Sequence, residues 1–187
     1  MKKLKFVVKY IKKYIIFQYY LLKKGTAFMK EYSKVIFETE EKDYFCLWFT
    51  DINSGFVTEE DHVACFRDED VFDAYCKAKG FTPKDTMLFD LSSLLSFAIG
   101  KDDDFDAPTL LNFWNICSDL AFTLKLDFIG DDDNETLSEI YDTLFFIQSA
   151  DEDGEEEDTT ITEDDLADLR EVIAEGCKMI VANLNAI

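Results

Sequence analysis

The stretch APTLLNFWNICSDLAFTLKL, residues 107–126, carries the clearest helical pattern in the chain. Pro108 suits the first turn of a helix, where its missing N–H group has no intrahelical bond to lose. Apolar side chains then recur with the period of an α-helix. They are Leu110, Leu111, Trp114, Cys117 and either Leu120 or Ala121. The stretch therefore predicts a long helix with one apolar face.

Three more helices are predicted around this one. Residues 134–149 and 162–184 repeat apolar positions at helical spacing, and Thr162 is a suitable N-cap for the second of them. Residues 68–80 begin with acidic side chains, which favour the start of a helix, and end at Gly80. These patterns predict that helices dominate the C-terminal half of the chain.

Strands are predicted mainly before the helices. Residues 31–39 and 43–51 are rich in β-branched and aromatic side chains and suit a hairpin, and residues 62–66 suit a third short strand. Residues 86–100 begin like a buried strand and continue as a short helix from about Asp90. Because this order places strands before most helices, the chain is predicted to be an α+β protein. Its small N-terminal antiparallel sheet is expected to pack against a C-terminal group of helices.

The charge divides the chain into two parts. Residues 1–28 contain eight of the 19 basic residues and none of the 40 acidic ones, which leaves 11 basic and 40 acidic residues for the rest. We therefore expect a basic amphipathic extension at 1–28 and a single acidic globular domain at 29–187. A domain this acidic repels nucleic acid and attracts basic proteins or cations. Its only arginines, Arg67 and Arg170, leave little capacity for bidentate phosphate recognition, so no nucleic-acid partner is expected.

Three interpretations of the basic extension stay open. Its apolar centre, residues 14–22, is too short to span a bilayer. It suits a helix on an anionic lipid surface, a signal or anchor segment, or a stretch that does not belong to the mature domain. The last interpretation is favoured because the composition changes abruptly at Met29, a natural start for the domain. Membrane contact is expected only through residues 1–28.

No catalytic, metal-binding or cofactor-binding pattern is recognisable in the sequence. His62 is the only histidine and has no positioned Ser or Cys partner, and the scattered cysteines offer no zinc-ligand pairs. The acidic runs that begin at Asp131 and Asp151 fail the EF-hand spacing, and no glycine-rich loop precedes a helix. The favoured interpretation is therefore a protein that is not an enzyme and holds no cofactor or metal. Five cysteines without paired spacing predict reduced core thiols in a cytoplasmic protein.

Acidic residues are concentrated in three runs: KDDDFDAP at 101–108, GDDDNE at 130–135 and DEDGEEED at 151–158. Such runs usually form a solvated surface, and residues 150–161 are expected to form a mobile loop. A partner-binding face is the alternative interpretation. Because the first two runs flank the long helix in the sequence, we expect them at its opposite ends.

Three patterns of the helical half belong together: LLNFWNICSDLAFTL at 110–124, IYDTLFF at 140–146, and a final run with Leu166, Leu169, Arg170, Val172 and Gly176. Over roughly residues 30–184 the chain resembles bacterial immunity proteins of the contact-dependent growth-inhibition type. The resemblance implies a cytoplasmic protein that binds one cognate toxin, often a nuclease, and neutralises it in a stoichiometric complex. The basic extension and the acidic run near 150–161 do not belong to the family pattern.

A nuclease toxin is cationic where it grips phosphate, so an acidic partner is steered to that surface. The residues predicted to face the toxin are Asp102, Asp103, Asp104, Phe105, Asp106, Asp131, Asp132 and Asp133. Phe105 fits either an aromatic anchor in the interface or a core position. Two other functions stay open, namely a membrane-associated acidic adaptor held by the basic extension and an enzyme with a carboxylate-based or metal-dependent site.

Overall fold

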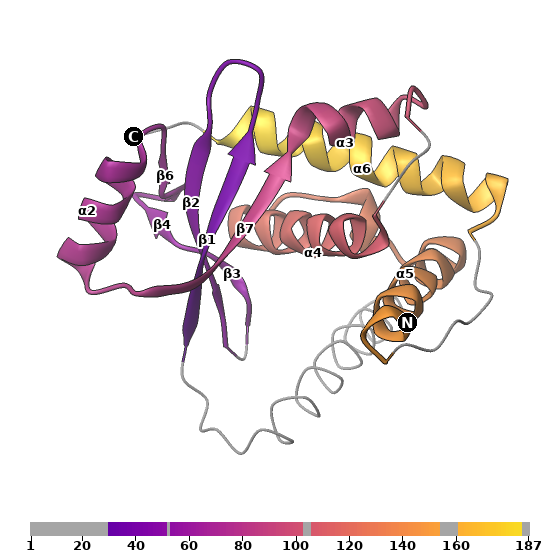
Figure 1. Cartoon of the computed structure of the whole chain (residues 1–187), viewed down its shortest axis with the longest axis horizontal. Helices are drawn as coiled ribbons and strands as arrows, with labels where there is room; N and C mark the ends of the chain where they lie inside the picture. The colour runs from indigo at the N-terminus through magenta and orange to yellow at the C-terminus, as the bar shows by residue number, and fades with distance from the viewer. Residues whose placement is uncertain (1–29, 52, 103–105, 154–160, 185–187) are drawn as a thin grey trace.

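The computed structural model describes residues 30–51, 53–102, 106–153 and 161–184. This part of the chain consists of a mixed sheet in the N-terminal half and of helices that mostly follow it (Figure 1). The predicted α+β class is confirmed. The basic extension predicted at 1–28 lies outside the described residues.

The centre of the sheet is the predicted hairpin. β1 (Glu31–Glu38) and β2 (Tyr44–Thr50) pair antiparallel. In the turn between them, the Thr39 N–H donates to the Lys42 carbonyl at 3.2 Å. The Thr39 hydroxyl donates to the same carbonyl at 2.6 Å and accepts from the Lys42 N–H at 3.0 Å. These bonds satisfy the backbone of the turn and fix its shape.

The edge strand makes the sheet mixed, whereas an antiparallel sheet was expected. β7 (Pro83–Asp90) pairs with β1 in parallel, which sets Glu38 opposite Asp90. The chain reaches β7 from β6 (Cys65–Phe66) through α2 (Glu69–Lys79). A helical crossover of this kind brings the next strand back in the same direction. The pairing direction therefore depends on the path of the chain, which the strand pattern alone does not reveal.

The other side of β2 is lined by short strands. β3 (Gly55–Phe56) and β6 both pair with β2 antiparallel. Between them, β4 (Thr58–Glu59) and β5 (His62–Val63) form a small hairpin of their own. Its turn residues Glu60 and Asp61 have φ values of 51° and 68°, in the left-handed region that tight hairpin turns require. The strand predicted at 62–66 is thus present as two separate pieces.

The remaining helices begin and end close to their predicted positions. They are α3 (Leu91–Ala98), α4 (Ala107–Leu124), α5 (Glu135–Asp153) and α6 (Glu163–Asn183), with the 3-10 turn η1 (Ile129–Asp131) between α4 and α5. α5 continues four residues beyond its predicted end, so the acidic run expected to form a loop starts inside a helix. None of the described helices is both long and apolar enough to cross a membrane.

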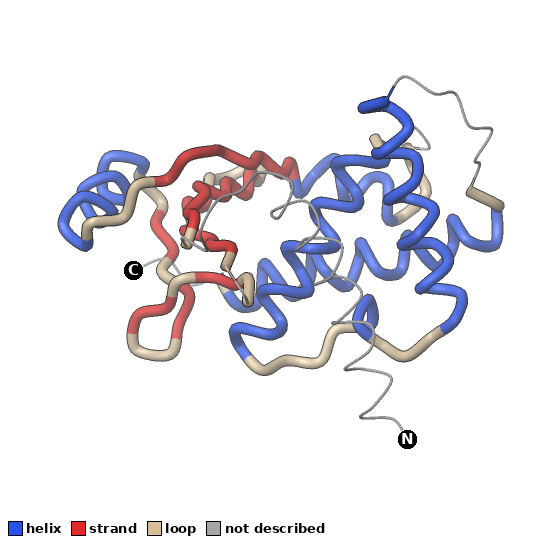
Figure 2. Tube along the Cα trace, turned by 90° about the horizontal axis from the view of Figure 1, so that it is seen from below, coloured by secondary structure: helices blue, strands red, loops and turns tan. Residues whose placement is uncertain are grey.

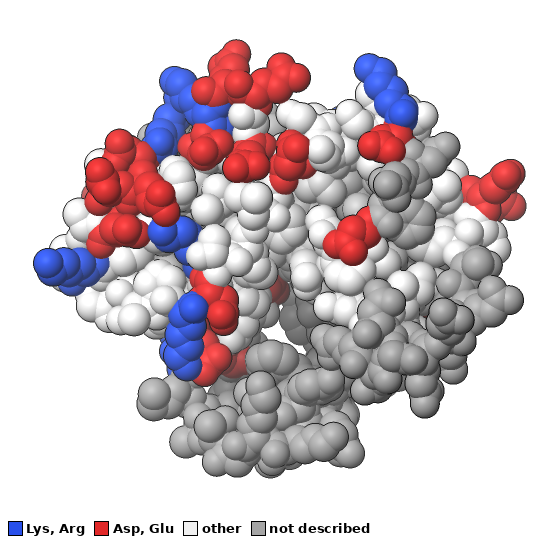
Figure 3. Space-filling view, viewed as in Figure 1, with Lys and Arg blue, Asp and Glu red and all other residues white. Residues whose placement is uncertain are grey.

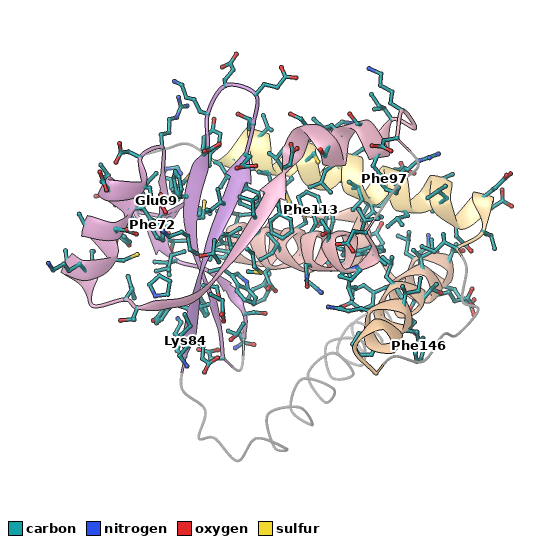
Figure 4. The ribbon with its side chains drawn as sticks, in the orientation of Figure 1. Glu69, Phe72, Lys84, Phe97, Phe113 and Phe146 are labelled. Carbon is teal, nitrogen blue, oxygen red and sulfur yellow. The ribbon has the colours of Figure 1, made fainter. Side chains whose placement is uncertain are left out.

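Helices cover both faces of the sheet. Figure 2 shows α2 on one side of the strands and the other helices on the opposite side. On the larger side, Val35 and Phe89 of the sheet share the main core with Phe113 of α4 and with residues of α3 and α6. On the α2 side, Phe72 packs against Phe66 in a smaller core. Phe72 and Phe113 mark these two faces in Figure 4.

α4 lies at the centre of the main core and is buried on more than one face. Eleven of its 18 residues are buried. The predicted apolar face is among them, but Phe113 and Ile116 on other sides of the helix are buried as well. A surface helix buries a single stripe, so burial of this extent requires neighbours on several sides.

Polar side chains of α4 find their partners inside the protein. The Asp119 carboxylate, only 4% exposed, accepts hydrogen bonds from Trp48 Nε1 at 2.9 Å and from the Ser54 hydroxyl at 3.0 Å. The Thr123 hydroxyl accepts from the Phe56 N–H at 3.0 Å. These bonds join the helix to β2, to β3 and to the segment between them.

Two more bonds join α4 to its other neighbours. Trp114 Nε1 donates to the carbonyl of Gly130 in η1 at 3.2 Å. On α5, the Tyr141 hydroxyl donates to Asn115 Oδ1 at 2.8 Å. Because buried polar groups are costly to leave unpaired, each bond favours one position of the neighbouring element.

Asp119→Ala is expected to lower the free energy of unfolding by about 2–4 kcal/mol, since it leaves the two partly buried donors without their acceptor. Urea-induced unfolding followed by circular dichroism measures the change. Asp142→Ala, an exposed position on α5, is the control and should be nearly neutral. Trp48→Phe removes one of the donors, so the double variant should cost less than the sum of the single changes. Strictly additive costs would contradict the proposed bond.

Candidate protein-binding surface

The structure separates the residues predicted to face a toxin into different environments. Asp103, Asp104 and Phe105 lie outside the described residues, so their role stays a prediction. The described ones are Asp102, Asp106, Asp132 and Asp133, which are exposed, and Asp131, which is partly buried.

Asp106 has a structural role at the start of α4. Its carboxylate accepts a hydrogen bond from the Thr109 N–H at 3.0 Å and another from the Thr109 hydroxyl. This is the geometry of an N-cap, which satisfies an N–H group that has no intrahelical partner. Capping alone is a sufficient reason for an acidic residue at this position, and no contact with a toxin is needed to explain it.

The second acidic run lies in a different place from the one expected. After α4 the chain turns at Lys125, whose φ of 58° ends the helix, and then runs back along it. The bond from Trp114 to Gly130 shows how far the chain returns, because Trp114 stands in the first half of α4. The run that starts at Asp131 therefore lies beside the N-terminal half of α4. The expectation that the two runs occupy opposite ends of the helix is wrong.

η1 is held closely on both sides. A Cβ atom at Gly130 would lie 2.5 Å from Trp114 Nε1 and 2.6 Å from the ring of Phe128, and both of these side chains are buried. On the α6 side, the Ile129 N–H donates to the Glu175 carboxylate at 3.2 Å. Only glycine permits this approach of the backbone to the indole.

Gly130→Ala is expected to lower the free energy of unfolding by about 1–3 kcal/mol, because the added methyl group must displace a buried aromatic ring. Urea-induced unfolding measures the change. Asp132→Ala alters an exposed side chain two residues further on and serves as the control. A Gly130→Ala protein as stable as the wild type would show that η1 does not pack this closely.

The fold joins a short acidic stretch, residues 38–43, to one carboxylate that is distant in the sequence. The resulting surface consists of Glu38, Glu40, Glu41, Asp43 and Asp90, which we call the hairpin acidic group. Glu38 and Asp90 are paired at the ends of parallel strands, and the other three residues are exposed around the β1–β2 turn. Figure 3 shows acidic side chains gathered over this turn and toward the start of α3. Only the parallel pairing of β1 and β7 brings Asp90 to the group, so the sequence did not predict it.

The hairpin acidic group keeps its excess of negative charge. In the described part of the chain, none of its five residues forms an ion pair. Lys42 lies in the same turn, and Arg67 stands at the border with its guanidinium 5.3 Å from the centre of the Tyr44 ring. Two basic residues against five carboxylates leave this surface negative.

Acidic residues on the α2 side are partly neutralised by lysines. Lys34 Nζ lies 2.8 Å from Glu69 and 3.2 Å from Asp73. Burial alone would lower the pKa of Lys34, but the hydrogen bonds to these two carboxylates outweigh it and raise the pKa. Glu59 pairs with Lys79 at 2.7 Å, and this bond, with a second one from Tyr75, lowers the pKa of Glu59. This side of the molecule is therefore less suited to attract a cationic partner.

Asp90 has a second role as the N-cap of α3. One carboxylate oxygen accepts from the N–H groups of Ser92 and Ser93 at 2.9 and 3.2 Å, and the other accepts from the Ser93 hydroxyl at 2.7 Å. The hydrogen bond from the Ser93 side chain is the main reason why the pKa of Asp90 is lowered. The ionised carboxylate thus stabilises the junction of β7 and α3.

Asp90→Ala is expected to lower the melting temperature most at neutral pH. The pKa is lower in the folded than in the unfolded chain, so the stabilisation is complete above the unfolded value of about 3.9 and is lost as the pH falls through the folded value. The difference between wild type and variant should therefore shrink between about pH 5 and pH 3. Scanning calorimetry across this range measures it, with Asp85→Ala on the same strand as the control. A difference that does not change with pH would contradict the role of the ionised cap.

The described residues provide few groups for chemistry. Within the described ranges, no group of three or more His, Cys, Asp or Glu residues is placed to hold a metal ion. His62 is exposed on β5. Asp119, the buried carboxylate, was not predicted, although a single acidic residue within an apolar helix was a signal for it. Its two described donors are neutral side chains, which fits a structural bond between helix and sheet.

All five cysteines are free and buried, as predicted. Burial raises the pKa of the Cys117 thiol well above its usual value and that of the Cys177 thiol to about 12. Such thiols remain protonated at neutral pH and are poor nucleophiles. The cytoplasmic location inferred from them stays a prediction.

Comparisons of the chain with protein-family models, with curated proteins and with solved structures found no match. The resemblance to immunity proteins therefore stays a prediction, and the arguments for a function rest on the residues and their geometry.

Proposed function

We propose that the chain is an immunity protein that binds and neutralises a cationic bacterial toxin, with a nuclease as the best-fitting class. The hairpin acidic group is the observation that carries the proposal. Its five carboxylates form no ion pair with other described residues, and they stand at the end of a sheet. A surface of this kind complements a protein that presents basic side chains.

Electrostatics favours such a partner over most alternatives. The chain has a formal net charge of −21, although residues 1–28 contribute eight lysines and no acidic residue. A field of this sign accelerates encounter with a cationic surface and slows encounter with nucleic acid. A nuclease must be cationic where it holds the phosphate backbone, and carboxylates that occupy this surface exclude the substrate.

The position of the acidic group also favours a well-defined complex. The Thr39–Lys42 bonds fix the turn, and the Ser92 and Ser93 bonds fix Asp90. Carboxylates held in place lose little entropy on binding. Leu88, which is 53% exposed on the same face of β7 as Asp90, offers apolar surface next to the charges.

A pull-down with the tagged full-length chain from its native strain, at low and high salt, tests the proposal. The wild type should retain a basic protein, and the purified partner should lose its activity on binding. Changing Glu40, Glu41 and Asp43 to Lys should weaken retention at least about tenfold, because three attractive charges become repulsive. Circular dichroism should show an unchanged fold, since all three side chains are exposed.

A matched variant separates this surface from the one predicted on the second acidic run. Asp132→Lys combined with Asp133→Lys changes two exposed residues beside α4. Retention that depends on this pair instead of the hairpin acidic group would move the binding surface to the run beginning at Asp131. If both variants retain the partner as well as the wild type, or if no basic protein is retained, the proposed function is wrong.

A further inference from the structure

Two of the five cysteines lie directly opposite each other in the sheet. β2 and β6 pair antiparallel, with Cys46 opposite Cys65 and Phe45 opposite Phe66. Both cysteines are fully buried, with an exposed fraction of 0%. They are 19 positions apart in the sequence and belong to different strands, so no short motif such as CxxC indicates that they are a pair.

The strand geometry places the two Cα atoms at a distance that suits a disulfide. Residues directly opposite in an antiparallel pair have Cα atoms about 4.5–5.5 Å apart. A disulfide bridges Cα atoms about 4.4–6.8 Å apart, so the backbone has no need to move. Cross-strand neighbours also extend their side chains from the same face of the sheet.

Burial confirms that both thiols point to the same side. Cys46 and Cys65 belong to the main core, whereas Phe45 and Phe66 belong to the smaller core on the other face. Burial, with a smaller contribution from the neighbouring Cys65 thiol, raises the pKa of Cys46 well above its usual value. The two thiols are therefore neighbours on the main-core face of the sheet.

Cys117 and Cys177 provide a natural comparison within the same core. They stand on α4 and α6, and burial dominates the rise of both pKa values. No strand register sets them opposite each other. Cys76 lies apart from both pairs, in the smaller core beneath α2.

We propose that Cys46 and Cys65 are a modification site at which a small disulfide, such as oxidised glutathione, converts the two thiols into a reversible intramolecular disulfide. The thiolate of one cysteine attacks oxidised glutathione and releases one glutathione thiolate, which leaves a mixed disulfide. The thiolate of the other cysteine then attacks the protein sulfur and releases the second glutathione. The protein loses two protons and two electrons, and oxidised glutathione is reduced to two molecules of glutathione.

Access to the thiols requires local opening, and we expect the short strand β6 to be the element that opens. It contains two residues and is paired only with β2 among the described strands. Short, weakly paired elements separate from a sheet far more often than the whole domain unfolds. Oxidation should therefore be slow in the folded protein and faster at higher pH and in mild denaturant.

The consequence of the disulfide is a covalent loop from Cys46 to Cys65. The loop contains Ser54 and Phe56, which are both bonded to α4. Cross-linking restricts the unfolded chain and prevents β6 from leaving β2. The oxidised protein is expected to melt at a higher temperature than the reduced protein.

The test incubates the purified full-length protein with excess oxidised glutathione at about pH 8.5, where thiolate is more abundant. The expected product is lighter by about 2 Da, the mass of two hydrogen atoms, and dithiothreitol restores the original mass. Cleavage after Glu59 and Glu60 separates the two cysteines, so a disulfide-linked peptide pair identifies the bond. The Cys117→Ala/Cys177→Ala double variant should still form it.

Cys46→Ala keeps a small apolar side chain in the core and controls for access. In this variant, Cys65 should accumulate a glutathione adduct in place of the internal bond. If the adduct forms but the wild type gives no Cys46–Cys65 link, the proposal is wrong. A link between Cys117 and Cys177 instead would overturn it equally. The last possible outcome is that neither the adduct nor the link forms, even in urea just below the unfolding midpoint. Small disulfides then do not reach the thiols, and the proposal is also wrong.

Discussion

The burial of α4 is the constraint on which the rest of the structure depends. Most of this helix is shielded from water, so its inward-facing polar side chains need partners within the protein. Asp119, Thr123, Trp114 and Asn115 find them in four different places: the indole of β2, the backbone of β3, the carbonyl of η1 and the tyrosine of α5. One helix thereby sets the positions of the sheet, of the returning segment and of α5.

The same constraint decides where the acidic residues can lie. Asp119 is the one buried carboxylate among the described residues, and it accepts hydrogen bonds from two neutral side chains. Others are engaged at the starts of helices, where Asp68, Asp90 and Asp106 satisfy free N–H groups. A further set is paired with Lys34 and Lys79 on the α2 side. The hairpin acidic group differs from these residues because four of its five carboxylates, all but that of Asp90, are neither helix caps nor members of an ion pair among the described residues.

The cysteines show how a single geometric feature changes the interpretation of a residue type. Considered one by one, they are small apolar side chains in a core, and their raised pKa values fit that role. Considered with the β2–β6 register, two of them become neighbours at the distance of a disulfide. The pairing of the two-residue strand β6 with β2 thus makes a disulfide between Cys46 and Cys65 possible, which the amino-acid composition alone does not indicate.

The sequence by itself determined the α+β class, most of the helix limits and some of the caps. Asp68, Gly80, Pro108 and Thr162 stand at the predicted ends of helices, because capping and periodicity depend on residues a few positions apart. Only the tertiary structure decided that β7 runs parallel to β1, that the chain returns along α4, and that Asp90 joins the acids of the hairpin. It also decided that Cys46 meets Cys65. Each of these features joins segments far apart in the chain, and which distant segments meet is set by how the whole core packs, information that no local pattern carries.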